Sequence, residues 1–293
     1  MDVGVALTGL LTGLLVGVTG MGGGALTMPL LTLGFGVPPL AAVSSDLVAG
    51  AVMKPLGAAV HLRRGTVQPR LVGWLCLGSL PCAAVGSLLA GSLGRGAESV
   101  LKEITGGAVL LAAGTLFARM ALSRRRSEST SDGTAVRLLP TVLLGGVAGL
   151  VVGTTSVGSG SIIIVCLLLL NRGLSSARLV GTDLVQAVPL VLVSALGHLY
   201  AGDVHFGLVG SLLVGSLPGV LVGSLISSRV PDRPVRVLLG GMLATTGVML
   251  LGADAAVGAG AGLLVVLLSA GVPPLRSAVS SRRAAAAGGT SGK

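Results

Sequence analysis

Long apolar stretches, separated by short polar or glycine-containing breaks, run along most of the chain. They cover residues 3–19, 25–36, 39–61, 68–92, 100–122, 138–155, 159–170, 176–200, 204–226, 235–252 and 255–271. About 20 apolar residues in a helix span the hydrocarbon core of a bilayer. Because most of these stretches approach or exceed this length, the pattern predicts an all-α polytopic membrane protein.

Composition and charge agree with this prediction. Hydrophobic residues make up 52% of the chain and charged residues 10%, whereas soluble domains carry about 25% charged residues. The net charge of +10 then indicates cytoplasmic loops rather than nucleic-acid binding. The three cysteines lie in apolar stretches without the spacing of a disulfide framework or zinc site, so we expect no metal and no cofactor. The N-terminus has no basic n-region and no A-x-A site, so we expect the first stretch to be retained.

The sequence contains an internal repeat. A shift of 136 places Gly13, Gly17, Thr19, Gly22 and Gly24 on Gly149, Gly153, Thr155, Gly158 and Gly160. A shift of 137 then places Asp46, His61, Gly65, Gly78, Ser79, Pro81, Gly86 and Ser87 on Asp183, His198, Gly202, Gly215, Ser216, Pro218, Gly223 and Ser224. Agreement of Asp, His and Pro in one register indicates a duplicated unit.

Each unit contains a glycine-rich break, at 19–28 and at 155–164. Glycine costs roughly 1 kcal/mol per helical position relative to alanine, so both stretches predict an interrupted helix. The segments after the breaks, 25–36 and 159–170, reach only about half-way across a bilayer, which favours re-entrant hairpins. We expect Gly9, Gly13, Gly17 and their counterparts at four-residue spacing to pack helices closely.

The distribution of basic residues tests the hairpin interpretation. With two hairpins, 17 basic residues fall on one side of the membrane and two, Arg95 and Lys102, on the other. If the two apolar segments on either side of each glycine-rich break formed one crossing helix, the same residues would be divided 11 against 8 between the two sides of the membrane. Since basic residues concentrate in cytoplasmic loops, the hairpins are favoured. The N-terminus is then outside, the C-terminus is cytoplasmic, and the two units are inverted.

These patterns divide the chain into five parts. We expect a first membrane repeat at 1–122, a cytoplasmic linker at 123–137, a second, inverted membrane repeat at 138–252, an extra transmembrane helix at 253–272 and a disordered cytoplasmic tail at 273–293. Each repeat holds one hairpin and three transmembrane helices. The expected location is the cytoplasmic (inner) membrane.

Inverted repeats with broken helices are typical of secondary transporters, whose substrates bind between the breaks. Helix N-termini and free backbone N–H groups favour anions. The predicted substrate-binding residues are the glycines and hydroxyl side chains of the two breaks together with one lysine, namely Thr19, Gly20, Gly22, Gly23, Gly24, Thr155, Ser156, Gly158, Ser159, Gly160, Ser161 and Lys54. The alternative for the glycines is a role in close helix packing alone.

Several motifs resemble the TauE/SafE sulfite exporter family of toluene-sulfonate uptake permeases. The resemblance covers most of residues 5–252. It lies in G-M-G-G-G-A-L-T-M-P-L-L, G-V-P-P-L-A-A-V-S-S-D and H-L-R-R-G-T-V, and in T-S-V-G-S-G-S, V-G-T-D-L and G-S-L-P-G of the second unit. It implies transport, with export expected, of sulfite, organosulfonates or related sulfur-containing anions. The second unit departs from the first by carrying Ser159 where the first carries Gly23.

Ionisable residues inside membrane segments are functional candidates, because a charge there costs about 2.5 to 3.5 kcal/mol on insertion scales. Asp46 and Asp183 are candidates for gating or proton relay; the alternative is helix N-capping. Lys54 has Val191 as its repeat counterpart. It is expected to pair with Asp183 or to bind an anionic substrate; the alternative is a side chain that snorkels to the cytoplasmic face.

Three more polar residues complete the gating candidates. His61 and His198 are counterparts at segment ends, where placement at the membrane interface competes with proton coupling. Gln186 follows Asp183 by three residues, and we expect it to line the same cavity.

The sequence favours a secondary transporter that works by alternating access. It contains no G-x-x-x-x-G-K-[ST] motif, so the expected energy source is an ion gradient, with a proton as a candidate coupling ion, or the substrate's own gradient. It also lacks H-E-x-x-H and G-x-S-x-G, so we expect no enzymatic activity. The alternative function is a non-transporting membrane scaffold or partner subunit. A homo-oligomer remains an open alternative to a monomer.

Overall fold

The computed structural model describes residues 2–19, 23–125, 138–160, 162–170, 176–201, 204–226 and 232–270 of the 293-residue chain. Five predictions fall wholly or mostly on residues outside these ranges. They concern Gly20, Gly22 and Ser161 of the glycine-rich breaks, most of the linker, and the tail.

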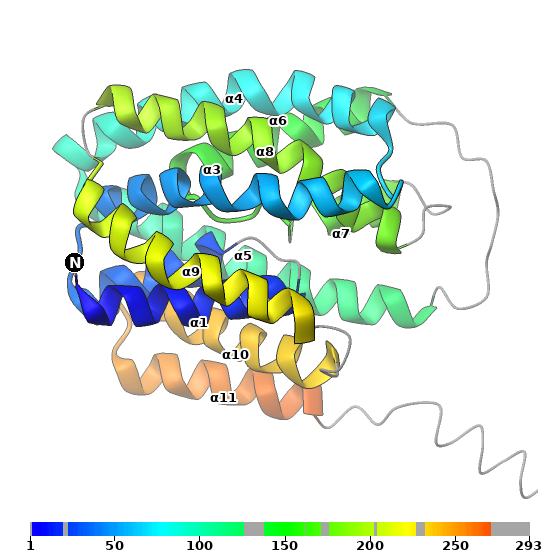
Figure 1. Ribbon diagram of the computed structural model, residues 1–293. Coiled ribbons are helices and arrows are strands. Elements are labelled where there is room, and N and C mark those ends of the chain that lie inside the picture. Colours follow the sequence, from blue (N-terminus) through cyan, green and yellow to red (C-terminus); the bar gives the residue numbers. More distant parts are fainter. Residues whose placement is uncertain are drawn as a thin grey trace, which may run out of the picture.

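The described residues form helices joined by short connections (Figure 1). The first half contains α1 (Val3–Thr19), α2 (Gly24–Pro29), the π-helical turn η1 (Leu30–Gly34), α3 (Pro39–Arg63), α4 (Pro69–Gly96) and α5 (Glu98–Arg125). The second contains α6 (Leu138–Thr155), α7 (Ile162–Leu170), α8 (Ser176–Ala201), α9 (Phe206–Ile226), α10 (Asp232–Leu250) and α11 (Ala255–Ala270). Every predicted apolar stretch corresponds to one of these helices, or to α2 with η1, so the all-α prediction is confirmed.

Length and hydropathy show which helices can cross a membrane. Within the described ranges, six helices are long and apolar enough: α3, α4, α5, α6, α8 and α9. Shorter apolar helices are α1, α2 with η1, and most of α10 and α11. The chain is therefore a polytopic membrane protein.

The outer surface of the bundle is apolar. Leu7, Leu143, Leu196 and Leu263 belong to different helices, and each exposes about 60% or more of its surface. Exposing such an apolar surface to water would cost free energy, whereas contact with lipid chains does not. The exposure therefore marks the lipid-facing surface of these helices.

Glycines bring two pairs of helices into backbone contact. A methyl group on Gly9 or Gly13 of α1 would lie 2.5 Å from the carbonyl oxygen of Leu212 or Ser216 on α9. Gly145, Gly149 and Gly153 of α6 make the corresponding approach to Leu75, Ser79 and Ala83 of α4. The two interfaces therefore use equivalent positions, and the prediction of packing glycines is confirmed.

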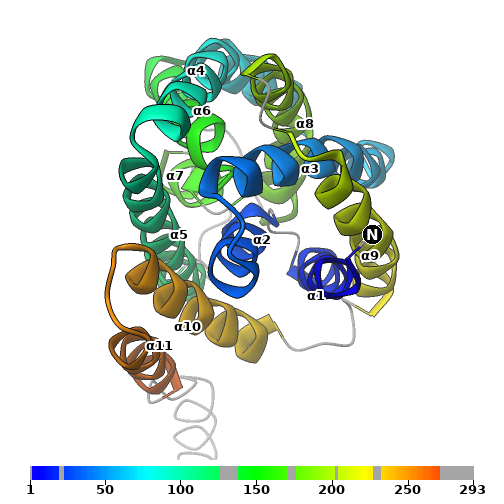
Figure 2. The same ribbon diagram turned by 90° about the vertical axis from the view of Figure 1, so that its left-hand side faces the viewer.

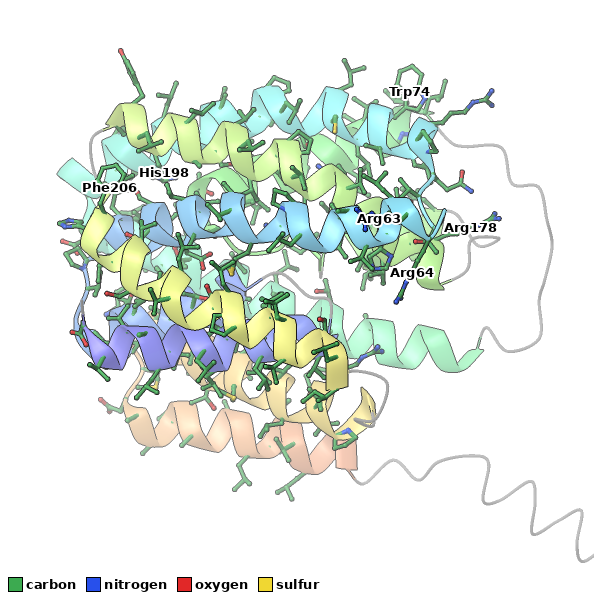
Figure 3. The ribbon with its side chains drawn as sticks, in the orientation of Figure 1. Arg63, Arg64, Trp74, Arg178, His198 and Phe206 are labelled. Carbon is green, nitrogen blue, oxygen red and sulfur yellow. The ribbon has the colours of Figure 1, made fainter. Side chains whose placement is uncertain are left out.

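The neighbouring helices α3 and α8 run in opposite directions. Arg63 and Arg64 at the end of α3 lie at the same end of the bundle as Arg178 near the start of α8, while His198 lies toward the other end (Figure 3). In an inverted repeat, counterpart helices such as α3 and α8 must run in opposite directions across the membrane. The inverted relation of the whole halves, and the domain boundaries, stay predictions.

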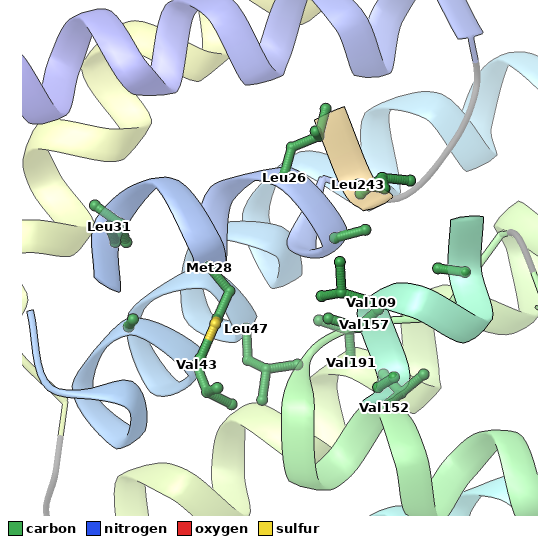
Figure 4. Close-up of a cluster of buried hydrophobic side chains, with 14 of the residues drawn as sticks. Leu26, Met28, Leu31, Val43, Leu47, Val109, Val152, Val157, Val191 and Leu243 are labelled. Atoms are coloured by element: carbon green, nitrogen blue, oxygen red, sulfur yellow. The ribbon is translucent and has the colours of Figure 1, made fainter. Parts of the chain in front are cut away.

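The short helices α2 and α7 lie inside the bundle. Figure 2 shows α2 enclosed by the longer helices α1, α3, α5 and α10. All six residues of α2 are buried, and Met28 packs with Val43 and Leu47 of α3 in the core (Figure 4). Irregular backbone at membrane depth is tolerated where protein covers it. This location brings the ends of α1 and α6 to the centre of the molecule.

Candidate functional site

The second glycine-rich break is a left-handed turn between α6 and α7. Ser156, Gly158 and Gly160 have φ angles of 59°, 108° and 105°. Glycine adopts such angles without steric cost, whereas a serine there is uncommon. Thr155 ends α6, and its hydroxyl donates to the carbonyl of Val151 at 2.7 Å. The helix is interrupted here as the sequence predicts.

The first break lies against the second. α1 ends at Thr19, whose hydroxyl donates to the Leu15 carbonyl at 2.6 Å, and α2 begins at Gly24. A methyl group on Gly24 would lie 2.6 Å from Ser156 Oγ and 2.8 Å from Asp46 Oδ2. Only glycine allows this approach. The two breaks and the carboxylate of Asp46 therefore meet at one point.

Asp46 joins α3 to the second break. Its side chain is buried, and its Oδ2 accepts a hydrogen bond from Ser156 Oγ at 2.5 Å. α3 begins at Pro39, because proline is favoured in the first turn of a helix. Asp46 thus lies in the second turn of α3, and Asp183 occupies the same position in α8. The helix-capping interpretation of both aspartates is wrong, since both helices start about two turns earlier.

Lys54, also on α3, contacts the second break at Ser159. Its Nζ donates to Ser159 Oγ at 2.8 Å. Lys54 also interacts electrostatically with both Asp46 and Asp183. The snorkelling interpretation is wrong, because the amine is held beside the break in the bundle interior. The region thus combines the amine of Lys54 with the hydroxyl of Ser159 and the nearby carboxylate charges.

A cavity of about 360 Å³ borders these groups. It is lined by Val16, Gly17, Gly23, Gly24, Asp46, Gly50, Met53, Lys54, Gly57, Val60, His61, Arg64, Ser156, Leu184, Val191, Val220, Ser224 and Leu225. The lining residues of α3 recur at intervals of three and four and so form one helical face. The cavity therefore extends along α3 from Asp46 toward the basic end of the bundle at Arg64 (Figure 3).

The sequence missed several residues of this cavity. Gly50, Met53 and Gly57 share one face of α3 with Asp46 and Lys54, and that spacing could have identified them. Val220 and Ser224 come from α9, and only the fold brings them to α3.

Other predicted residues lie away from the cavity. Gln186 is fully buried, does not line the cavity, and donates from Nε2 to Ser79 Oγ at 2.8 Å. Asp183 is also buried, and its described relation to the site is its electrostatic interaction with Lys54. In the second break, Gly158 and Gly160 are buried.

The two histidines occupy different environments. His61 lines the cavity, and its Nδ1 contacts Thr66 Oγ1 at 2.9 Å. His198 is fully buried, with Nδ1 2.8 Å from Ser44 Oγ and Nε2 2.9 Å from the Gly153 carbonyl. His198 is therefore enclosed by protein, whereas His61 faces the cavity.

Comparison with known proteins gives the family. The model of the family "Sulfite exporter TauE/SafE" matches residues 5–250. The chain is 35% identical over 261 residues to "Probable membrane transporter protein YjnA" of Bacillus subtilis, covering 86% of this chain and all of that protein. It is 28% identical over 228 residues to "Probable membrane transporter protein YdhB" of the same organism, covering 78% of this chain and 91% of that protein. No solved structure matches. The chain therefore belongs to the TauE/SafE sulfite exporter family of membrane transporters.

Proposed function

We propose that the protein is a secondary transporter that exports sulfite, an organosulfonate or a related sulfur-containing anion across the cytoplasmic membrane by alternating access. The observation that carries this proposal is the meeting of the two glycine-rich breaks beside Lys54. Family membership supports transport, and the family's name supports the class of anion.

The chemistry around the breaks suits an oxyanion. Lys54 offers a positive charge, and Ser159, whose oxygen accepts from Lys54, keeps its own hydroxyl proton to donate. Gly23 and Gly24 line the cavity with backbone that has no side chain to obstruct a ligand. Oxyanions bind through such charged and hydroxyl donors. An incoming anion would take the place that Ser159 Oγ holds on Lys54.

Apolar side chains form much of the rest of the cavity. Val16, Met53 and Val191 lie beside the polar groups and could accommodate the organic part of a sulfonate. The proposed substrate-binding set remains the glycines and hydroxyl residues of both breaks with Lys54, as derived from the sequence.

The two carboxylates have a separate proposed role. Asp46 and Asp183 both act on Lys54 electrostatically, so an anion at Lys54 would also face them. Protonation of a carboxylate would reduce that repulsion. Asp46 and Asp183 are thus proposed for proton relay, and Gln186, His61 and His198 for gating; the coupling ion would be a proton.

A flux measurement in proteoliposomes tests the proposed function. The purified chain is reconstituted, and movement of sulfite, taurine and sulfate is followed with and without a pH gradient. We expect saturable flux of sulfite or taurine that exceeds sulfate flux and that protein-free vesicles lack. Absence of flux for every anion would contradict transport and favour the non-transporting scaffold.

A further inference from the structure

The residues that line the cavity can be compared with their repeat counterparts in the described part of the second half. Under the shifts of 136 and 137, the lining residues Gly17, Asp46, Gly50, Met53, Gly57 and His61 correspond to Gly153, Asp183, Ala187, Leu190, Ser194 and His198. Four lining residues, Gly17, Met53, Gly57 and His61, are half-buried, whereas their counterparts Gly153, Leu190, Ser194 and His198 are buried. Asp46 and Gly50 are buried, as are their counterparts. Four of these positions are thus open to a cavity at one end of the bundle and closed at the other.

The helices that flank these positions are also arranged differently. At the closed end, a methyl group on Gly197 of α8 would collide with Ser87 of α4, so these two helices are in close contact. Their counterparts are Val60 of α3 and Ser224 of α9, which both line the cavity and are both exposed. In Figure 1, α9 diverges from α3 toward this end. Closing the cavity would require α9 to approach α3 as α4 approaches α8.

His198 holds the closed end together. Its imidazole connects three helices: it belongs to α8, contacts Ser44 of α3 and donates to the carbonyl of Gly153 at the end of α6. A fully buried imidazole with both nitrogens in hydrogen bonds is costly to expose or to separate from its partners. Opening this end would break these bonds.

His61 has the same potential partners at the open end. The counterpart of Gly153 is Gly17, which lines the same cavity as His61. The counterpart of Ser44 is Gly181, which lies against His61: a methyl group on Gly181 would be 3.1 Å from His61 Nδ1. Gly181 has no hydroxyl, and His61 Nδ1 contacts Thr66 instead. His61 thus lies against the counterpart of Ser44 and shares a cavity with the counterpart of Gly153, without the buried bonds of His198.

We infer that His198 and His61 are paired latches of alternating access: His198 closes one end in this structure, and His61 closes the other end by bonding to the Gly17 carbonyl when His198 is released. This inference rests on the proposed function because it takes alternating access as the mechanism. Since Gly181 stands where the other half has Ser44, the hydroxyl partner of the His61 latch is Thr66.

Cysteine labelling tests the latches without measuring transport. In a background with Cys76, Cys82 and Cys166 replaced by alanine, Gly57→Cys reports on the open cavity, because a side chain there meets open space. Ser194→Cys reports on its buried counterpart. The reagent is a polar methanethiosulfonate, and labelling rates in proteoliposomes are read by mass spectrometry. Gly57→Cys should label faster than Ser194→Cys.

The latch variants should shift the two rates in opposite directions. His198→Ala should raise Ser194→Cys labelling and lower Gly57→Cys labelling, by about threefold to tenfold for the loss of one or two hydrogen bonds. Ser44→Ala should do the same to a smaller extent, which covers the case in which His198→Ala does not fold. His61→Ala should change the rates in the reverse sense. His205→Ala, at an exposed histidine, is the control and should change neither.

Equal changes at both reporter positions, or no change in the histidine and serine variants, would overturn the latch inference. Reciprocal labelling without anion flux would leave the latches standing and contradict the proposed substrate class. Flux without reciprocal labelling would support transport and reject the latches. The two proposals can therefore fail independently.

Discussion

Lys54 is a residue at which the two halves differ in charge, because its repeat counterpart is Val191. Both residues line the cavity, so the difference gives the cavity one positively charged wall. A buried lysine amine costs free energy unless it is compensated. The nearby carboxylates and Ser159 compensate it here, which leaves the amine available to an anionic substrate that replaces Ser159.

Replacing Lys54 by methionine should reduce anion transport strongly. The variant removes the charge but keeps an unbranched side chain of similar length. The anion concentration that gives half-maximal flux should therefore rise about tenfold to a hundredfold, as expected for loss of a charged hydrogen bond. Lys54→Arg, which retains the charge, is the matched comparison and should keep more of the flux. Sulfite flux in proteoliposomes measures both. Normal flux in Lys54→Met would remove Lys54 from the substrate site.

Ser156 combines an uncommon backbone angle with a hydrogen bond to Asp46. Ser156→Val should lower the thermal midpoint in detergent, since a β-branched residue in the left-handed region costs about 1–2 kcal/mol. Ser156→Gly relieves the backbone and removes the hydroxyl together with its β-carbon, so its thermal midpoint should fall less while anion flux changes. Equal thermal midpoints for the two variants would show that the backbone angle at residue 156 does not restrict which side chain is tolerated there.

At the scale of helices, the glycine interfaces decide how closely α1 approaches α9 and α6 approaches α4. Gly13 and Gly149 are counterparts, and each places its helix against a serine of the facing helix. Lipid provides no hydrophobic driving force for such contact, so close backbone approach is a main source of stability. The interfaces should therefore tolerate no side chain at these positions.

Gly13→Leu and Gly149→Leu should each destabilise the protein by about 1–3 kcal/mol or more, because a side chain would be forced into the facing backbone. Gly107→Leu on α5 is the matched control, since its position is exposed and faces open space. Thermal midpoints and the monodisperse fraction in detergent measure the effect. A Gly107→Leu variant as unstable as the other two would contradict the interface explanation.

At the scale of the whole molecule, the basic residues define an orientation that labelling can test. Arg63 lies at the basic end, and Asp254 lies in the connection between α10 and α11. In a background without native cysteines, an impermeant thiol reagent on intact cells should label Asp254→Cys but reach Arg63→Cys only after permeabilisation. The reverse pattern would place the N-terminus inside and overturn the predicted orientation.

The sequence by itself determined the class, the helices and the two breaks. Apolar length, glycine content and the repeat are local properties, and in a membrane each helix satisfies its own backbone hydrogen bonds. The helices therefore follow the apolar stretches closely, even though α5 extends to Arg125, into the predicted linker. The family motifs lie within the same stretches, so they too could be recognised without coordinates.

Only the tertiary structure decided which polar groups meet and which end is closed. The sequence treats Asp46 and Asp183 alike, as it does His61 and His198, because a repeat predicts equal environments for its counterparts. Packing makes them unequal: one histidine is buried between three helices while the other lines a cavity. A transporter occupies one conformation at a time, so the difference between counterpart residues is a property of that conformation and does not appear in the repeat itself.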